Sequence, residues 1–200
     1  MTESTAIPNR IVNAAVTVIG RQGLRASSLE DIAAEAGCGR ATVYRAFPGG
    51  RDEVMYATLM ASVDSIFSAC ECAAQCYCEE ECCCSLGESV AAIVQSAAIE
   101  ISSHQALQRL LEDEPGVILD LLMFERFNFV LEKASFASVA YLERFVSADE
   151  AAKIGEWCAR VVIENLRAQH PGFDLTDLAV CRQLVDTFLV PGIQRNSGGN

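Results

Sequence analysis

The sequence predicts an all-α fold, and three observations support this prediction. Ala, Leu, Glu, Arg and Gln dominate the periodic segments, and none of these segments alternates apolar and polar residues as a half-buried strand does. Capping boxes, each a Ser followed three residues later by Glu, mark helix starts at Ser27, Ser85 and Ser147. Gly and Pro stand where the helical periodicity stops.

The first three predicted helices are short and closely spaced. The first covers residues 8–22 and ends at Gly23; its apolar face consists of Ile11, Ala14, Ala15, Val18 and Ile19. The second begins after an N-cap at Ser27 and stops at Gly37. The third covers residues 40–47 and ends against Pro48-Gly49-Gly50.

Longer helices are predicted for the rest of the chain. One starts near residue 51 and enters a cysteine-rich tract, and a second begins after Ser85. Further helices are expected over residues 104–112, 117–145, 148–169 and 176–190. The last of these should stop at Pro191-Gly192, and the remaining residues should be frayed.

The charges divide the chain into two parts. The net charge is −12, but residues 1–51 carry six Arg against four acidic residues, a net +2, and residues 52–200 carry the other 9 basic against 23 acidic residues, a net −14. A weakly basic segment beside a strongly acidic one indicates a two-domain DNA-binding protein, because only the basic part attracts phosphate. We therefore expect a DNA-binding domain over residues 1–50 and a second domain over residues 51–200.

Other classes of protein find little support. No apolar run approaches the ~20 residues of a membrane span, and the N-terminus lacks a signal pattern, so a cytoplasmic protein with no membrane partner is expected. No Ser/His/Asp or metal-hydrolase spacing occurs, so the chain is not expected to be an enzyme. The two histidines, His104 and His170, fall at a helix start and in a Pro-Gly break, where surface or capping roles are expected.

The two short helices joined by a Gly-containing turn, with a supporting helix before them, form a helix-turn-helix arrangement. The second helix of the pair is expected to enter the major groove of double-stranded DNA and to present its N-terminal residues to the base edges. Arg40 and Arg45 can pair with guanine, the Thr42 methyl group can contact thymine, and Tyr44 can reach a phosphate. The absence of a side chain at Gly39 permits close approach of the backbone.

The stretch IVNAAVTVIGRQGLRASSLEDIAAEAGCGRATVYRAFPGGRDEVMYATL resembles the N-terminal domain of the TetR (tetracycline repressor-like) family. The resemblance rests on a helix that ends at Gly23, followed in order and spacing by Ser27-Ser28, Asp31-Ile32-Ala33, Ala36-Gly37, Thr42-Val43-Tyr44 and Phe47-Pro48. It implies a homodimeric, all-helical regulator, usually a repressor, with a C-terminal helical domain for ligand binding and dimerisation. The ligand would release the dimer from a palindromic operator.

The resemblance also implies roles for single residues. Ser27 would cap the second helix and contact phosphate, and Arg51 would lie near phosphate at the start of the connecting helix. Tyr44 would contact the DNA backbone, and Arg45 a base or a phosphate. The expected DNA-binding residues are Arg25, Ser27, Gly39, Arg40, Thr42, Tyr44, Arg45 and Arg51. The chain departs from the family at Gly49-Gly50, where a polar residue and Lys are usual, so one phosphate contact lacks its usual residue.

The aromatic residues of the second domain gather in LLMFERFNFVLEKASFASVAYLERF. Small Ala and Ser residues between them leave room for an apolar ligand. Because TetR-like domains enclose a cavity lined by their middle helices, this stretch is the expected effector pocket; core packing is the alternative. The candidate lining residues are Met123, Phe124, Phe127, Asn128, Phe136, Tyr141 and Phe145.

The last two predicted helices carry broad apolar stripes. The resemblance implies that they pair with the same helices of a second copy in a four-helix bundle; the alternative is that they cover the core of the single chain. The candidate interface residues are Trp157, Val161, Leu184, Val185 and Phe188.

Seven of the ten cysteines lie in CECAAQCYCEEECCC, residues 70–84. At 100° per residue their thiols surround a helix, so core packing is not expected to explain the tract. Cys38, Cys158 and Cys181, by contrast, fall at apolar positions and should be buried.

The tract leaves three interpretations open. Its short spacings are similar to those of tracts that bind Zn(II) or Cu(I), so the regulator would sense metal or redox state through its thiolates. A metal-buffering protein is the alternative from another class, and an inert loop is the third. The candidate ligands are Cys70, Cys72, Cys76, Cys78 and Cys82. The DNA-binding function itself requires no cofactor.

Overall fold

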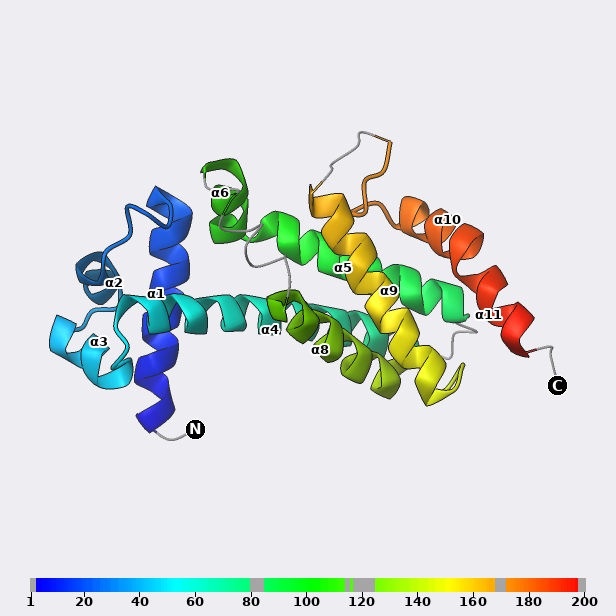
Figure 1. The fold of residues 1–200 in the computed structure, drawn as a ribbon, viewed down its shortest axis with the longest axis horizontal. Helices are drawn as coiled ribbons and strands as arrows, with labels where there is room; N and C mark the ends of the chain where they lie inside the picture. The colour runs from blue at the N-terminus through cyan, green and yellow to red at the C-terminus, as the bar shows by residue number, and fades with distance from the viewer. Residues whose placement is uncertain (1–2, 80–84, 114–115, 117–124, 168–171, 198–200) are drawn as a thin grey trace. The chain divides into compact units, whose positions relative to one another are not determined.

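The structure, a computed structural model, describes residues 3–79, 85–113, 116, 125–167 and 172–197. Its regular elements in these residues are all helices, which confirms the all-α prediction (Figure 1). They are α1 (Glu3–Gln22), α2 (Leu29–Glu35), α3 (Arg40–Ala46), α4 (Arg51–Glu79), α5 (Leu86–Ser103), α6 (Gln105–Asp113), α8 (Glu125–Leu142), α9 (Ala148–Arg167), α10 (Leu178–Phe188) and α11 (Val190–Ser197). None of the described helices combines the length and the apolar content that crossing a membrane requires.

The helices pack as two compact units. Unit 1 comprises Met1–Ser65 and Ile101–Leu121, and unit 2 comprises Ile66–Glu100 and Leu122–Asn200. The first part of α4 therefore belongs to unit 1 and the remainder to unit 2. The expected boundary between residues 50 and 51 divides the chain by function and not by packing, and it stays a prediction.

The helices α1, α2 and α3 enclose the core of unit 1. The apolar face predicted for α1 is confirmed, since Ile11 and Val18 are fully buried. They belong to one cluster with Ile32 of α2, Val43 of α3 and Val54 of α4, which are also fully buried. Burying one such side chain contributes roughly 1.5–3 kcal/mol. This shared core fixes α3 against the supporting helices.

The helix α2 begins one residue later than predicted. Ser28 is its N-cap: the Ser28 Oγ accepts from the Asp31 N–H at 3.1 Å, and the Asp31 Oδ2 accepts from the Ser28 N–H at 3.1 Å. Ser27 is only 2% exposed, and its hydroxyl donates to the Gly23 carbonyl at 2.6 Å. The prediction of Ser27 as the cap is wrong because both serines stand three residues before an acid, so the spacing does not separate them.

The turn between α2 and α3 requires glycine for its backbone. Gly37 has φ 61°, in the left-handed region that other residues rarely adopt. Gly39 follows in an extended conformation as the N-cap of α3. A second glycine of this kind, Gly50 with φ 69°, separates α3 from α4. The predicted breaks at Gly37 and at residues 48–50 are confirmed.

The helix α6 completes unit 1 by packing on α1. Gly20 allows the close approach, since a Cβ atom there would lie 3.2 Å from the Gln105 Cβ and 3.3 Å from the Ala106 N. Ala106 is buried at this contact. His104 precedes the helix, and its Nδ1 accepts from the Leu107 N–H at 3.3 Å, which confirms a capping role.

Two helices of unit 2 begin at the predicted capping boxes. The Ser85 Oγ accepts from the Glu88 N–H at 3.2 Å, and the Glu88 Oε2 accepts from the Ser85 N–H at 3.0 Å. Ser147 and Glu150 form the same pair of bonds at 3.3 and 3.2 Å. The starts of α5 and α9 are therefore as predicted.

The helices α8 and α9 of unit 2 cross in direct contact. Gly155 of α9 lies against α8, where a Cβ atom would come within 2.3 Å of the Ser138 Oγ and 2.4 Å of the Ala134 carbonyl oxygen. Leu142 and Ile154 are buried beside them. The absence of a side chain at Gly155 sets the separation of the two helices.

The end of the chain differs from the prediction. The helix expected over residues 176–190 is α10, which ends at Phe188, and a further helix, α11, runs through Pro191-Gly192 to Ser197. The expectation that Pro191 ends the helix is wrong because Pro191 is the second residue of α11, where its missing N–H would have no partner in any case. Residues 117–124, also predicted as helical, lie outside the described residues.

Candidate nucleic-acid interface

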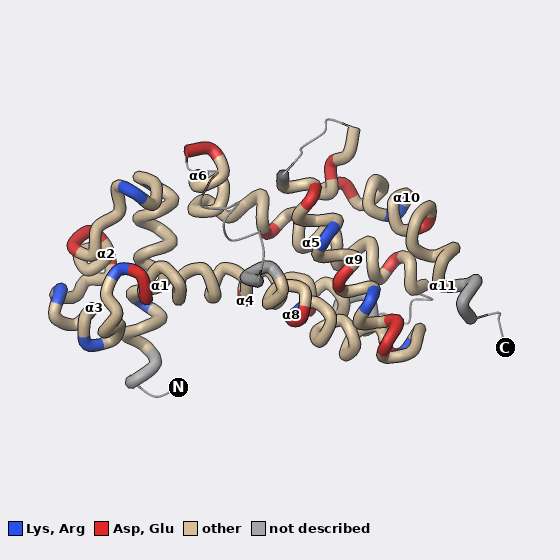
Figure 2. Tube along the Cα trace, in the orientation of Figure 1, with Lys and Arg blue, Asp and Glu red and all other residues tan. Residues whose placement is uncertain are grey.

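The helix α3 turns one face into the core of unit 1 and the other toward solvent. Val43 is fully buried, whereas Arg40, Tyr44 and Arg45 are exposed and Thr42 is half-buried. The charged side chains of this helix are both arginines. Figure 2 shows basic positions around α3, and all of them are arginines because residues 1–51 contain no Lys. The exposed face therefore combines positive charge with hydroxyl groups. Both kinds of group donate hydrogen bonds to phosphate oxygens and to acceptor atoms on base edges.

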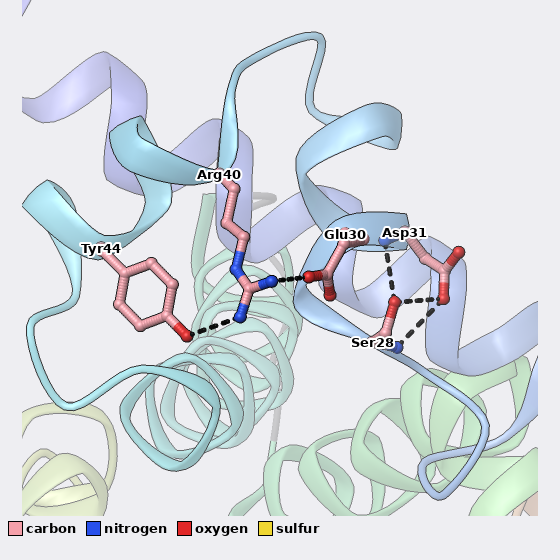
Figure 3. Close-up of polar contacts among 5 residues, drawn as sticks. All are labelled: Ser28, Glu30, Asp31, Arg40 and Tyr44. Atoms are coloured by element: carbon pink, nitrogen blue, oxygen red, sulfur yellow. Dashed lines mark hydrogen bonds and ion pairs between the residues drawn. The ribbon is translucent and has the colours of Figure 1, made fainter.

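Arg40, at the first position of α3, is held from two sides. Its Nη1 forms an ion pair with a carboxylate oxygen of Glu30 on α2, and its Nη2 donates to the Tyr44 hydroxyl at 3.2 Å (Figure 3). The guanidinium carbon lies 5.4 Å from the centroid of the Tyr44 ring. The bond to Tyr44 and the charge of Glu30 raise the pKa of Arg40 above its usual value. The side chains of both charged partners are more than half exposed.

Arg51 and Ser27, both expected to contact phosphate, form hydrogen bonds within unit 1. The half-buried Arg51 donates from Nε to the Ser27 carbonyl at 3.2 Å and from Nη2 to the Leu24 carbonyl at 2.5 Å. It thereby ties the start of α4 to the loop between α1 and α2. The Ser27 hydroxyl is buried as described above, so a phosphate contact by this side chain would first have to break its bond to Gly23. Arg25 is exposed in the same loop.

The turn before α4 explains why this chain has glycines where a polar residue and Lys are usual. Gly50 has φ 69°, and a Cβ atom there would lie 3.3 Å from the Tyr44 Cε1. The Gly49 N–H donates to the Glu53 Oε2 at 2.6 Å, which caps the first turn of α4. The backbone of the turn therefore favours glycine, at the cost of the side chain that would reach phosphate.

The residues predicted for the effector pocket are only partly brought together. Met123 and Phe124 lie outside the described residues, and so does the side chain of Phe127. Asn128 and Phe136 line a surface groove of about 540 Å³ between α8 and α9. The rest of its wall consists of Leu131, Glu132, Ser135, Val139, Ala152, Glu156 and Arg160. Phe136 is 86% exposed, so it stands at the rim and not in an enclosed cavity.

Tyr141 and Phe145 do not line this groove. Burial of the Tyr141 hydroxyl, with a smaller effect of the nearby Glu71, raises the pKa of Tyr141. Phe145 is half-buried beneath the guanidinium of Arg144, whose carbon lies 4.4 Å from the ring centroid. The Arg144 Nη2 also donates to the Ser89 Oγ at 3.3 Å. Both aromatic side chains are therefore half-buried in unit 2, away from the groove.

The residues predicted for the dimer interface do not form one exposed face. Leu184 and Val185 are buried within the chain's own unit 2, as the alternative interpretation of these helices required. Trp157 and Val161 are half-buried. Phe188, at the end of α10, is 71% exposed. Of the predicted set, Phe188 therefore offers the largest apolar surface to a partner.

The predicted burial of Cys158 and Cys181 is confirmed, and Cys38 is half-buried. Cys70 of the tract is also buried, since it is only 8% exposed and its thiol donates to the Ile93 carbonyl at 3.7 Å. Core packing therefore accounts for this first cysteine of the tract, whereas Cys72 is exposed.

The remaining cysteines of the tract lie beyond what the structure describes. This holds for the side chains of Cys76 and Cys78 and for residues 82–84 as a whole. Among the described residues, no group of three or more His, Cys, Asp or Glu side chains is placed to hold a metal ion. Burial raises the pKa of the Cys70 thiol to about 12, so this group is protonated at neutral pH.

Two parts of these sites have no signal in the sequence. Glu30 pairs with Arg40 across the turn between two helices, at a separation that no helical periodicity links. The α9 wall of the groove, which includes Glu156 and Arg160, exists because α9 crosses α8. Both arrangements depend on tertiary packing, and reasoning from single segments therefore misses them.

Comparison with known proteins agrees with the geometry of the head, by which we mean α1, α2, α3 and the start of α4, residues 3–55. Residues 11–55 match the family model described as bacterial regulatory proteins, tetR family. This segment includes the whole of α2 and α3 and the start of α4. Among curated proteins, none matches the sequence.

Solved structures match nearly the whole chain. The TetR family repressor AlkX from Dietzia sp. strain DQ12-45-1b has 17% sequence identity and a TM-score of 0.69, with 94% of this chain and 95% of that chain covered. A TetR-family transcriptional regulator from Mesorhizobium loti has 16% identity and a TM-score of 0.63, with 96% and 98% covered. The fatty acid degradation regulator FadR from Bacillus halodurans has 17% identity and a TM-score of 0.58, with 92% and 97% covered.

At these identities the structural matches show the fold, and the sequence match over residues 11–55 shows the family of the head. The match covers the helix-turn-helix whose exposed arginines and hydroxyl groups are described above. By its head the chain matches the tetR family of bacterial regulatory proteins over residues 11–55, and over nearly its whole length it has the fold of solved TetR family regulators.

Proposed function

We propose that this protein is a non-enzymatic, homodimeric repressor that binds a palindromic operator and leaves it when an apolar small molecule binds unit 2. The observation that carries the proposal is the orientation of α3. Val43 anchors this helix in the core while Arg40, Thr42, Tyr44 and Arg45 remain on its outer side. An anchored helix with this chemistry fits the major groove, where Arg reads guanine and hydroxyl groups bind phosphate.

Selection of bound sequences from a random duplex library tests operator recognition. We expect the library to converge on a sequence with two related half-sites, because a two-fold protein presents α3 twice. Arg45→Ala should then weaken operator binding by about 1–3 kcal/mol. The matched control is Lys153→Ala, which removes the same charge from an exposed position on α9. The absence of any selected sequence would refute operator recognition.

An apolar effector is supported by the groove and by two structural relatives. Leu131, Val139 and Ala152 line the groove, and Phe136 stands at its rim. AlkX is implicated in the biodegradation of n-alkanes, and FadR is a fatty acid degradation regulator, so both names concern long apolar chains. The groove also carries the polar residues Asn128, Glu132, Ser135, Glu156 and Arg160, so it suits an apolar chain that ends in a polar group.

Two measurements test the effector. Native mass spectrometry of protein purified under reducing conditions should reveal bound lipid, and adding fatty acids or alkanes should release the selected operator. Phe136→Ala should weaken this release. Its control is Phe129→Ala, a change on the same helix at a partly exposed residue outside the groove. Equal effects of the two changes would argue against the groove as the effector site, and bound metal without lipid would favour metal sensing.

The homodimer is supported by the tetR family match of residues 11–55, because regulators of this family often dimerise, and Phe188 at the end of α10 is its candidate contact. Phe188 is 71% exposed, an arrangement that leaves a large apolar side chain in water unless a partner covers it. Sedimentation equilibrium should give twice the chain mass, and Phe188→Ser should raise the dimer dissociation constant. Thr187→Ala, a change at the neighbouring exposed residue, serves as the control. A monomer at micromolar concentration would contradict the proposal.

A further inference from the structure

We propose that Glu30 makes α3 selective for base sequence, because it neutralises Arg40 toward phosphate while leaving Arg40 able to bind guanine. The inference rests on the proposed DNA-binding function and assigns a specificity-determining role to a residue on α2, the helix before the recognition helix. Glu30 acts through Arg40 and is therefore a positioning residue.

The geometry places Glu30 and Arg40 together on the outer side of the head. Figure 3 shows the guanidinium between the Glu30 carboxylate and the Tyr44 hydroxyl. The Nη1 atom pairs with Glu30, the Nη2 atom donates to Tyr44 at 3.2 Å, and the cation lies over the Tyr44 ring. Arg40 is therefore oriented before DNA arrives, so less side-chain entropy is lost on binding.

Arg40 keeps donors for DNA in this arrangement. A guanidinium carries five N–H groups, and the contacts to Glu30 and Tyr44 use two of them. Three remain for the O6 and N7 acceptors of a guanine, which Arg binds in the major groove. The pair with Glu30 therefore does not remove the capacity for base contact.

The electrostatic consequence differs between phosphate and guanine. An Arg–Glu pair has no net charge, so its attraction to the negative phosphate is much weaker than that of Arg alone. The carboxylate itself also repels phosphate. Guanine O6 and N7 are uncharged acceptors, so a nearby carboxylate weakens their binding to Arg40 far less than it weakens the binding of phosphate. Glu30 thus weakens the sequence-independent contact more than the sequence-specific one.

The expected size of the effect follows from exposure. The side chains of Arg40 and Glu30 are 57% and 56% exposed. Water screens such pairs, and their measured strength corresponds to about a two- to five-fold change in an equilibrium constant. We therefore expect the Glu30→Gln variant to bind scrambled duplex about two- to five-fold more tightly. The salt dependence should steepen by about 0.9 in the log–log slope, because one more phosphate contact is made.

The head supplies a matched control. Arg21 and Glu35 form a second exposed ion pair, with Nη1 and Oε2 3.1 Å apart, at the ends of α1 and α2. Glu35→Gln removes one negative charge from the same helix as Glu30→Gln, but it releases an arginine that is not on α3. A general effect of charge would therefore change both variants equally, whereas release of Arg40 would affect only Glu30→Gln.

The experiment uses wild type, Glu30→Gln and Glu35→Gln. It also compares Arg40→Ala with the double variant Arg40→Ala/Glu30→Gln. Dissociation constants are measured for the selected operator and for a scrambled duplex of the same length over a range of salt concentrations. Circular dichroism confirms that each variant is folded. The expected result is tighter scrambled-duplex binding and a smaller operator-to-scrambled ratio for Glu30→Gln only, with no effect of Glu30→Gln once Arg40 is absent.

Elution from heparin adds a measurement that needs no operator, since heparin is a polyanion without bases. Glu30→Gln should elute at higher salt than both wild type and Glu35→Gln. Equal behaviour of Glu30→Gln and Glu35→Gln on scrambled duplex and heparin would overturn the role of Glu30. Failure of the proposed function has a different signature, namely no selected operator for wild type. In that case the heparin and scrambled-duplex comparison still decides whether Glu30 neutralises Arg40.

Discussion

Arg51 donates to the carbonyl oxygens of Ser27 and Leu24, and through them the first turn of α4 holds the loop that joins α1 to α2. The resemblance to the TetR family places this arginine near phosphate, whereas the structure gives its guanidinium two partners inside unit 1. The two roles lead to different outcomes when Arg51 is removed.

Arg51→Ala should lower the free energy of unfolding by about 1–3 kcal/mol, because hydrogen bonds from a charged donor are lost and two carbonyl groups lose their partner. Urea denaturation measures this change. Arg21→Ala, which removes an exposed pair with Glu35, should cost no more than about 1 kcal/mol. Unchanged stability, together with a shallower salt dependence of DNA binding, would instead favour a phosphate contact.

Ser28→Ala should destabilise the head by about 1 kcal/mol, since Ser28 satisfies the Asp31 N–H at the start of α2. Thermal unfolding followed by circular dichroism measures the loss. Ser27→Ala tests the other serine, because it removes a buried hydroxyl that donates to the Gly23 carbonyl and leaves the Ser28 cap of α2 in place. If Ser27→Ala lowered helix content at α2 as a lost cap would, and Ser28→Ala did not, the assignment of the cap would be incorrect.

The stability of the head should depend on pH through Asp31. Hydrogen bonds from the Ser28 side chain and backbone lower the pKa of Asp31 below its usual value. A carboxyl group with a lowered folded-state pKa contributes stability that is fully present above the unfolded-state pKa of about 3.9 and is lost as the pH falls toward the folded-state value. Melting temperatures between pH 6 and pH 3 should therefore fall less in Asp31→Asn than in wild type. Parallel curves for the two proteins would contradict this assignment.

Gly155→Ala should destabilise unit 2 strongly, because the new methyl group would overlap with the Ser138 Oγ and the Ala134 carbonyl at the crossing of α8 and α9. Overpacking of this kind typically costs about 1–3 kcal/mol. Gly192→Ala is the matched control, since nothing lies within 4 Å of a Cβ atom at that position. Alanine at residue 192 should instead stabilise α11 by about 0.5–1 kcal/mol. Similar melting temperatures for the two variants would show that the helices can separate without cost.

Alkylation with iodoacetamide should distinguish the first two cysteines of the tract. Cys70 is buried, and its pKa of about 12 keeps the thiol protonated near pH 7.5, whereas Cys72 is exposed. Mass spectrometry of peptides from briefly labelled native protein should therefore show modification at Cys72 well before Cys70. Urea should make the two rates similar. Rapid labelling of Cys70 in the native protein would mean that its contact with the Ile93 carbonyl is not maintained.

Local patterns predicted the helices that depend on local chemistry. The boxes at Ser85 and Ser147 and the glycine turn at Gly37 satisfy backbone groups within a few residues, so their residue types are sufficient evidence. The boundary at Ser27 failed because two overlapping boxes compete, and burial of the Ser27 hydroxyl decides between them. Burial is a property of the fold and is not visible in a short segment.

The candidate sites show the same difference between features set by a single segment and features set by tertiary packing. The exposed face of α3 could be predicted, because the periodicity that buries Val43 also exposes Arg40 and Tyr44. The ion pair of Glu30 with Arg40 could not be predicted, since it depends on the angle between two helices. Helical geometry predicted only that the seven thiols of the tract cannot all face the core, and it did not predict that Cys70 does face it.

Unit 1 is discontinuous in sequence, because α6 packs on α1 at Gly20 only after α5 has intervened. During synthesis the first three helices leave the ribosome long before α6 does. The surface of α1 around Gly20 therefore stays uncovered until α6 has been translated. A fragment that stops at residue 65 would leave this surface uncovered. The natural unit of folding for the head is therefore the chain through α6, and a newly made head acquires its complete surface only after α5 and α6 have been translated.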